Sequence, residues 1–263
     1  MPLDLDLALQ TARRAVEAAS AASLPHFRQG VRVEVKPDRT PVTAADREAE
    51  AAILAVIRGA FPAHAVLGEE TGAHAGSAES RWIVDPIDGT RGFTRGGSFW
   101  GPLVALEHEG AVVVGAMAMP ALGDVYFAAR GRGAHLARRG EAPLRLSVSG
   151  IRDWGESTLS LGEFRGLFSP DRERQLLDLC RSAAQVRCYG DLAGAAMVLQ
   201  GRAEAWVEAG VKVWDLAPLQ ILASEAGGLF TDLAGNATVE SGNCLLSNGQ
   251  VHGQVLARLS AGP

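Results

Sequence analysis

The stretch from residue 82 to residue 90, WIVDPIDGT, constrains this chain more than any other. Residues 82–84 are large and apolar, which predicts a buried strand. Pro86 has no backbone N–H to donate, so we expect it to end the hydrogen-bond ladder of that strand. Asp85 and Asp88 then stand at the strand end, three residues apart. A fold that buries this strand must bring two carboxylates to one edge of its sheet.

Gly89 and Thr90 follow these carboxylates directly. Glycine allows a tight turn and lets a ligand approach the backbone amides around Thr90. Two hard oxygen ligands beside amide groups suit Mg²⁺ and a phosphate together. Taken alone, the motif is more often a capped turn that binds nothing, so its interpretation depends on the rest of the chain.

Length and composition exclude several classes of protein. The 263 residues can bury a large core, and the net charge of −5 argues against a nucleic-acid-binding protein. No signal peptide is visible, and no apolar stretch approaches the roughly 20 residues of a membrane span, so we expect a cytoplasmic protein without a membrane partner. Cys180, Cys188 and Cys244 lack paired spacing and are expected to be buried thiols in a reducing compartment.

Further acidic motifs lie upstream and downstream of the central turn. Asp46 occupies the acidic position of a predicted capping box at a helix start. Glu69 and Glu70 follow the short apolar strand 65–67, where they can enter a cleft or form an exposed acidic loop. Asp215 opens a helix, where a plain helix cap is the simpler interpretation of that motif alone.

Together these motifs resemble the signature sequences of the inositol monophosphatase family, which comprises Mg²⁺-dependent, Li⁺-sensitive phosphatases. They occur in the family's order and span residues 42–228. The matching motifs are VTAAD at 42–46, GEE at 68–70, DPIDGT at 85–90, and WDLA followed by EAGG within 214–228.

The resemblance implies a layered α-β-α-β-α sandwich that combines α+β and α/β parts. It also implies that a metal-activated water hydrolyses a small phosphate monoester, with two or three Mg²⁺ ions in each site. The metal ligands implied in this way are Glu69, Asp85, the carbonyl of Ile87, Asp88 and Asp215.

Other roles are implied in the same manner. Thr90 orients the attacking water, and either Glu70 or Asp46 accepts its proton. The amides of Gly89 and Thr90 bind phosphate oxygens. Lys36 matches the lysine of a flap that closes over the site, although a solvated loop lysine would look the same. The family also suggests a homodimer.

We expect two halves that meet near residue 148. The pattern of residues 1–148 predicts an antiparallel sheet, two helices and most of the metal ligands, with a polar surface excursion at 71–80 and a glycine-rich loop at 91–101. Residues 149–263 alternate strands and helices, which is typical of an α/β unit, and carry Asp215 and the substrate-binding residues. The expected helices are 4–29, 44–59, 171–180, 190–201, 214–227 and one from about 248; the expected strands are 31–35, 65–67, 82–84, 102–107, 111–118, 124–128, 159–162, 186–189, 203–208, 229–230 and 245–246.

Substrate preference rests on few residues. Asp191, which follows Gly190, resembles the histidinol-phosphate phosphatase branch and its place in histidine biosynthesis, because the inositol branch tends to carry a small hydroxyl residue there. A carboxylate at that position can pair with the ammonium or imidazole group of the substrate. However, that branch usually carries a tyrosine where this chain has Ala193, and Glu208 resembles the inositol branch, where the glutamate contacts sugar hydroxyls.

We therefore expect L-histidinol phosphate as the substrate, with inositol-1-phosphate as the alternative. Fructose-1,6-bisphosphate and 3′-phosphoadenosine compounds are further options, and the latter would need a basic pocket that the sequence does not clearly contain. A regulatory protein that kept the fold is the non-enzymatic alternative. A missing metal ligand would support it, but every residue of the implied ligand set is present.

Overall fold

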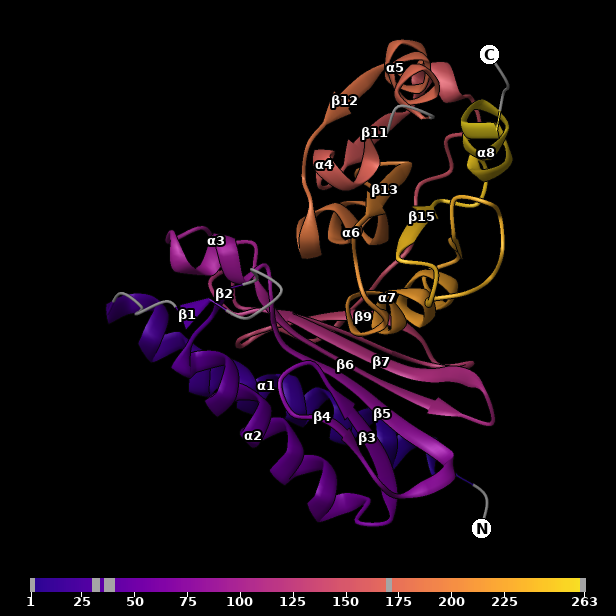
Figure 1. Ribbon diagram of the computed structural model, residues 1–263. Coiled ribbons are helices and arrows are strands. Elements are labelled where there is room, and N and C mark those ends of the chain that lie inside the picture. The colour runs from indigo at the N-terminus through magenta and orange to yellow at the C-terminus, as the bar shows by residue number, and fades with distance from the viewer. Residues whose placement is uncertain (1–2, 30–33, 36–40, 169–171, 261–263) are drawn as a thin grey trace.

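Figure 1 presents the computed structural model of the chain, which describes residues 3–29, 34–35, 41–168 and 172–260. Two long helices, an eight-stranded sheet, a middle helical layer, a five-stranded sheet and outer helices follow one another in space. The expected α-β-α-β-α sandwich is therefore confirmed.

The eight-stranded sheet is formed by the first half of the chain. Its strands are β3 (His64–Gly68), β4 (Gly72–His74), β5 (Ser77–Asp88), β6 (Gly101–His108), β7 (Ala111–Met119), β8 (Asp124–Ala129), β9 (Gly133–Arg138) and β10 (Leu144–Arg145). They lie in the order β10-β9-β8-β7-β6-β5-β3-β4. All neighbours are antiparallel except β3 and β5, which run parallel and place Gly68 beside Val84.

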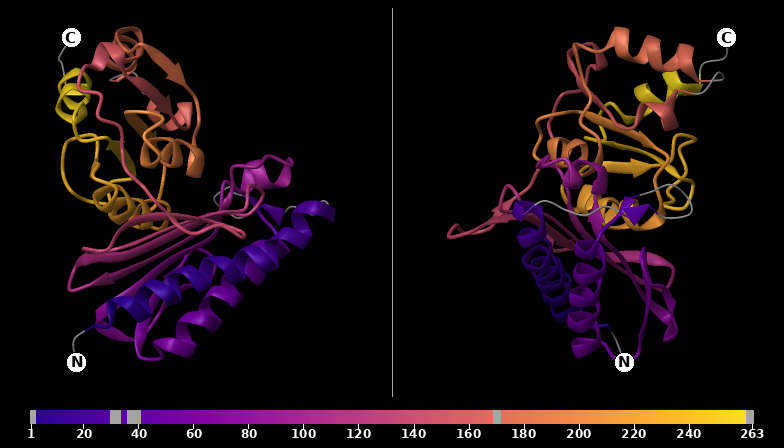
Figure 2. Two further views of the ribbon diagram at one scale, coloured as in Figure 1. Left: turned by 180° about the vertical axis from the view of Figure 1, so that it is seen from behind. Right: turned by 60° about the vertical axis from the view of Figure 1, so that its left-hand side comes forward.

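Helices cover both faces of this sheet (Figure 2). On one face, α1 (Leu5–Gln29) packs against α2 (Ala44–Ala60) and against β6, β7 and β8. On the other face, α7 (Val213–Glu225) packs against β6 and β7. Trp82 and Val84 belong to the core under α1 and α2, whereas Ile83 belongs to the core under α7. The run at 82–84 is continuously apolar because both faces of β5 are buried.

The five-stranded sheet belongs to the second half of the chain. Its strands are β11 (Thr158–Leu161), β12 (Gln185–Arg187), β13 (Ala205–Ala209), β14 (Leu229–Thr231) and β15 (Asn243–Ser247), in the order β12-β11-β13-β15-β14. The helices around it are α4 (Phe164–Leu167), α5 (Glu173–Ser182), α6 (Asp191–Leu199) and α8 (His252–Ser260). Short elements elsewhere are β1 (Glu34–Val35), β2 (Pro41–Val42), α3 (Thr90–Thr94) and the 3₁₀ turn η1 (Trp154–Glu156).

The start of α2 follows the sequence prediction closely. Thr43 is the N-cap residue, and its hydroxyl accepts a hydrogen bond from the amide of Ala45. Asp46 completes the capping box by accepting from the amide of Thr43 at 2.7 Å. Since this contact satisfies an otherwise unpaired donor at the helix start, the predicted cap is confirmed.

The prediction that Pro86 ends its strand is wrong, because β5 continues to Asp88. Its partner positions on β6 are Leu103 for Asp85 and Gly101 for Asp88, so β5 carries one extra residue here, a β-bulge. In a regular strand, side chains three positions apart point to opposite faces. The bulge cancels that alternation and lets both aspartates face one side.

Two other expectations need a partial correction. The excursion expected at 71–80 contains β4 and the first residues of β5, and the loop expected at 91–101 begins within α3 but is irregular from residue 95 to residue 100, as predicted. In each case the pairing or packing of neighbouring elements outweighs the local turn and loop preferences of Gly and polar residues.

The three cysteines are free thiols, but only Cys244 is buried as expected. Cys180 is partly exposed and Cys188 is exposed. Among the helices of the described ranges, none combines the length and apolar character that crossing a bilayer requires.

Candidate active site

A cleft of about 390 Å³ lies between the ends of β3 and β5 and the starts of α6 and α7. It collects most of the residues singled out from the sequence. Those lining it are Glu69, Asp85, Ile87, Asp88, Gly89, Thr90, Asp191, Glu208 and Asp215.

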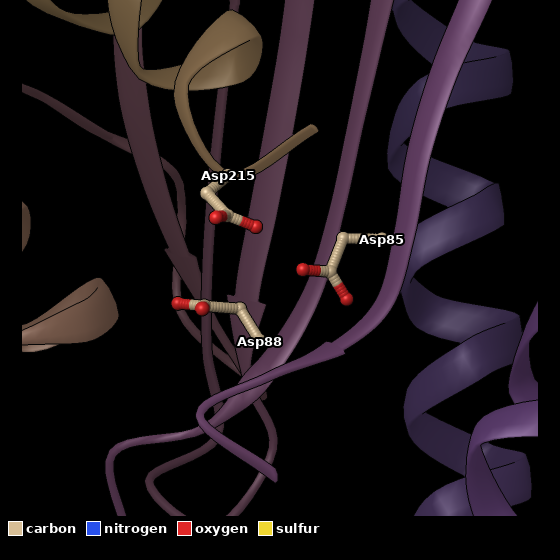
Figure 3. A group of neighbouring side chains, drawn as sticks. All are labelled: Asp85, Asp88 and Asp215. Atoms are coloured by element: carbon tan, nitrogen blue, oxygen red, sulfur yellow. The ribbon is translucent and has the colours of Figure 1, made fainter. Parts of the chain in front are cut away.

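Three aspartates form the centre of this cleft. Carboxylate oxygens of Asp85, Asp88 and Asp215 all lie within 4.8 Å of one another. Figure 3 shows the two aspartates of β5 and the aspartate of α7 close together, with the carboxylates of Asp85 and Asp215 directed toward each other. Residues more than 120 positions apart in the chain therefore form one group of oxygen donors.

Backbone amides orient two of these carboxylates. Asp85 accepts a hydrogen bond from the amide of Ile87 at 2.9 Å, across the bulge. Asp215 stands in the first turn of α7 and accepts from the amide of Lys212 at 2.7 Å. Its position at the positive end of the helix dipole favours the ionised carboxylate.

Crowding and burial nevertheless oppose ionisation of the cluster. Burial, followed by the neighbouring Glu69 and Asp215 carboxylates, raises the pKa of Asp85 well above its ordinary value. Burial and the Asp191 carboxylate do the same to the pKa of Asp88. Burial raises the pKa of Asp215 to about 6. A bound divalent cation would offset this repulsion, and carboxylate oxygens are the donors that hard cations prefer, so the residues fit a metal site.

The turn after β5 carries Gly89 and Thr90, the residues predicted to bind phosphate and to orient the attacking water. Gly89 adopts a left-handed φ of 76°, a conformation that favours glycine, and α3 begins at the next residue. The hydroxyl of Thr90 donates to the carbonyl of Ile87 at 2.9 Å. The side chain of Thr90 and the carbonyl of Ile87 are thus coupled inside the cleft.

Some predicted site residues lie outside the cleft lining. Asp46 is buried in the capping box of α2, close enough to Glu69 for that carboxylate to contribute, after burial, to a raised pKa of Asp46. Glu70 and Gly190 adjoin lining residues without lining the cleft themselves. Lys36 lies outside the described residues.

The other end of the cleft is also acidic. The buried carboxylate of Glu208 accepts hydrogen bonds from the amides of Glu163 at 2.6 Å and Ala209 at 3.1 Å. Burial raises the pKa of Glu208 to about 7. Burial, and then the Glu163 carboxylate, raise the pKa of Asp191. A β-carbon added to Gly89 would lie 3.4 Å from an Asp191 carboxylate oxygen, so this acid adjoins the turn after β5.

Sequence reasoning missed several lining residues. Glu163, Arg91, Lys212 and Trp214 all face the cleft. A signal for Glu163 was present, because it follows a predicted strand just as Glu69 follows residues 65–67. Trp214 is the first residue of the WDLA motif, but no site role was predicted for it, and nothing in the local pattern around Arg91 and Lys212 distinguishes them from loop residues.

Comparison with known proteins agrees with this geometry. A model of the inositol monophosphatase family matches residues 4–262. The chain belongs to the inositol monophosphatase family. Histidinol-phosphatase of Mycobacterium tuberculosis is 40% identical over 262 residues, which cover 98% of each chain. Histidinol-phosphatase of Streptomyces coelicolor is 37% identical and covers 96% of each.

Solved structures show the same relationship. Inositol monophosphatase from Anabaena has a TM-score of 0.83 at 28% identity, covering 99% of this chain and 98% of that one. An IMPase/NADP phosphatase has a TM-score of 0.85 at 20% identity, which shows the shared fold alone. The recognition of the family from its motifs is confirmed, and this member is a phosphoric monoester hydrolase with an acidic cluster suited to the family's use of metals.

Proposed function

We propose that this phosphatase hydrolyses L-histidinol phosphate. One observation carries the choice of substrate: Glu163, Asp191 and Glu208 line the same cleft as the aspartate cluster. Beyond the phosphate end, the cleft therefore suits a substrate that carries its own positive charge. The relatives named histidinol-phosphatase, at 37% and 40% identity over nearly the whole chain, support this choice.

We further propose Mg²⁺ as the metal, with two or three ions in the site. The ligands would be Glu69, Asp85, the Ile87 carbonyl, Asp88 and Asp215. Support comes from the mutual distances within 4.8 Å among the three aspartates and from the exclusively oxygen donors. When bound, Mg²⁺ supplies Lewis acidity for the phosphoryl group and a nucleophilic water near neutral pH.

The protein groups around this centre would bind and orient the substrate. In this proposal, Thr90 orients the water, and Asp46 or Glu70 accepts its proton. Asp46 is supported by its Oδ1 oxygen, which is buried and accepts no hydrogen bond within the described ranges. The amides of Gly89 and Thr90 would bind the phosphate oxygens, and Lys36 would belong to a flap over the site.

In this view, residues 1–148 supply most of the chemistry and residues 149–263 supply substrate selection. Asp191, with Gly190 before it, would contact the cationic part of the substrate. Glu208 would shape the pocket mainly through its backbone partners, because its carboxylate already accepts two amide hydrogen bonds.

Inositol-1-phosphate is the second candidate. It is supported by relatives of solved structure that are named inositol monophosphatases, such as the Anabaena protein. An uncharged polyol would gain nothing from an acidic pocket beyond ordinary hydrogen bonds, so the charge of the cleft favours the first candidate.

A non-enzymatic role is a weaker alternative. Haemophilus influenzae Nus factor SuhB is 32% identical over 260 residues, which cover 97% of this chain. The complete set of proposed ligands in the cleft favours an enzyme.

The deciding experiment compares phosphate release from L-histidinol phosphate and inositol-1-phosphate, each with Mg²⁺ and with EDTA. We expect histidinol phosphate to be preferred by about 100-fold in kcat/KM, or about 2.7 kcal/mol. Asp191→Asn should lower that preference by about 10- to 100-fold, because a charge-assisted contact contributes about 1.5–3 kcal/mol. Asparagine suits the left-handed φ of 52° at this position. Preference for inositol-1-phosphate, or hydrolysis that persists in EDTA, would contradict the proposal.

We also propose a homodimer in a reducing compartment. Phe99 and Leu122 are 46% and 49% exposed beside a cavity that Tyr189 and Met197 also line, and a second copy would cover this face. Free thiols at Cys180 and other positions support the compartment. Light scattering after gel filtration tests the dimer, and Leu122→Asp should weaken it; a monomeric wild type would exclude it.

A further inference from the structure

Glu50 is a completely buried carboxylate outside the lining of the cleft. It lies on α2, one helical turn after Asp46, so both acids occupy the same face of that helix. Its carboxylate accepts hydrogen bonds from the amide of Glu70 at 2.8 Å, from the amide of Thr71 at 2.9 Å and from the hydroxyl of Thr71. All three donors belong to the turn that follows Glu69.

Gly68 shows how closely this carboxylate approaches the turn. A β-carbon added to Gly68 would lie 2.8 Å from the carboxyl carbon of Glu50, a separation that real side chains do not reach. The glycine before Glu69 is therefore needed for space: its absent side chain leaves room for the Glu50 carboxylate.

Thr71, which donates its hydroxyl hydrogen to Glu50, is itself held by hydrogen bonds that lead through His74 to Arg58. Arg58 contacts Nδ1 of His74 at 3.2 Å, and Nε2 of His74 contacts the Thr71 hydroxyl at 2.6 Å. Arginine can only donate and a carboxylate can only accept, so the donors run from Arg58 through His74 and Thr71 to Glu50. This direction gives neutral His74 its proton on Nε2.

The turn is attached to the sheet as well. The amide of Glu69 donates to the carbonyl of Val84 at 3.2 Å, which places Glu69 beside the residue that precedes Asp85. Glu69 thus lies between an attachment to β5 and an attachment to α2 through Glu50. Together, these two attachments fix the backbone on both sides of Glu69. A fixed backbone limits the directions that the Glu69 side chain can take.

We infer that Glu50 is a positioning residue that holds the turn 68–71 so that the Glu69 carboxylate faces the metal cluster. The inference rests on the proposed function, in which Glu69 is a metal ligand. Groups that orient ligands in this way typically change metal affinity by about 10- to 100-fold when they are removed. A purely structural buried acid would change folding stability without a matching change in metal affinity.

The test is calorimetric titration of Mg²⁺ into the purified full chain. Glu50→Gln keeps the size of the side chain but directs an amide donor at backbone N–H groups, so we expect the Mg²⁺ dissociation constant to rise about 10- to 100-fold. The Mg²⁺ concentration for half-maximal turnover should rise by the same factor, with kcat recovering at saturating Mg²⁺. Glu48→Gln, an exposed residue of α2, is the matched control and should bind Mg²⁺ like the wild type.

Gly68→Ala provides a second variant, because it leaves Glu50 in the chain but displaces its carboxylate. It should weaken Mg²⁺ binding as Glu50→Gln does, and it decides the matter if Glu50→Gln fails to fold. Thr71→Ser keeps the hydroxyl and should behave like the wild type.

Glu69→Gln separates this inference from the proposal beneath it. If Glu69→Gln binds Mg²⁺ like the wild type, the assignment of Glu69 as a ligand is wrong. A different outcome is that Glu69→Gln weakens Mg²⁺ binding, whereas Glu50→Gln, or Gly68→Ala if Glu50→Gln does not fold, binds Mg²⁺ like the wild type. In that case Glu69 remains a metal ligand, and the role inferred for Glu50 is overturned.

Discussion

The two sheets bring carboxylates to the cleft in different ways. In the eight-stranded sheet, Asp85 and Asp88 lie on one strand and reach a common side through a bulge. In the second half of the chain, Asp191 and Asp215 lie at the starts of α6 and α7, and Glu208 lies on β13 of the five-stranded sheet with its carboxylate against backbone amides.

This difference separates two kinds of acidic site. The aspartates of β5 are fixed by strand pairing and have their pKa raised well above ordinary values, so a bound cation would stabilise their ionised forms. Glu208 and Asp215 accept hydrogen bonds from backbone amides, as Asp85 does, but burial raises their pKa only to about 7 and about 6. The first region is suited to a constant metal chemistry, and in the second region Asp191 at the start of α6 can vary without removing a member of the aspartate cluster, whereas Asp215 at the start of α7 belongs to that cluster.

The largest effect is expected from a substitution in the aspartate pair of β5. Asp88→Asn removes one charge from the cluster, and we expect kcat to fall by about 1,000-fold or more, since metal ligation contributes several kcal/mol to the transition state. Circular dichroism should show an unchanged fold. Asp178→Asn, at a 61% exposed side chain of α5, is the control, and wild-type turnover by Asp88→Asn would refute the site assignment.

The second prediction concerns the pH dependence of stability without metal. Glu208 and Asp215 bind protons more tightly in the folded state than in the unfolded state, where their values are 4.5 and 3.8. The free energy of unfolding in EDTA should therefore be highest near pH 4 and fall as the pH rises toward 7.

The share of Glu208 in this loss is on the order of 3 kcal/mol. Urea denaturation at several pH values measures it, and Glu208→Gln should flatten the curve. Added Mg²⁺ should restore stability near pH 7 in the wild type and in this variant. A curve that rises between pH 4 and pH 7 would rule out the raised pKa values.

A smaller effect is expected at Glu163, which lines the cleft from the second half of the chain. Glu163→Gln keeps a side chain that can accept the cap hydrogen bond of Arg165 but removes the charge. Because Glu163 is exposed, we expect kcat/KM for histidinol phosphate to fall only about fivefold, with inositol-1-phosphate unaffected. Equal losses for both substrates would mean that Glu163 shapes the pocket without selecting charge.

The smallest predicted change concerns the helix behind the metal cluster. Thr43→Ala removes the N-cap of α2 and should lower the free energy of unfolding by about 1 kcal/mol. Thr43→Ser should retain most of it. A loss of activity larger than the loss of stability would indicate that the cap also orients Asp46, whose carboxylate accepts from the Thr43 hydroxyl at 2.6 Å.

Much of the fold could be predicted because its signals are local. The capping box at Thr43 and the apolar run at 82–84 depend on neighbours in sequence, and both appear as expected. The predictions for 71–80 omitted β4 and the start of β5, because strand pairing there depends on partners elsewhere in the chain, and the prediction for 91–101 omitted the short helix α3 at its start.

By itself, the sequence determined the family, the layered fold and the acidic residues of the candidate site, since each is encoded in short motifs of fixed order. Only the tertiary structure decided that Asp85 and Asp88 share one face, that Glu163 lines the cleft and that Glu50 lies beneath the turn at Glu69. The physical reason is that strand register, burial and long-range hydrogen bonds join residues far apart in the chain, and no local pattern records which partner each will meet.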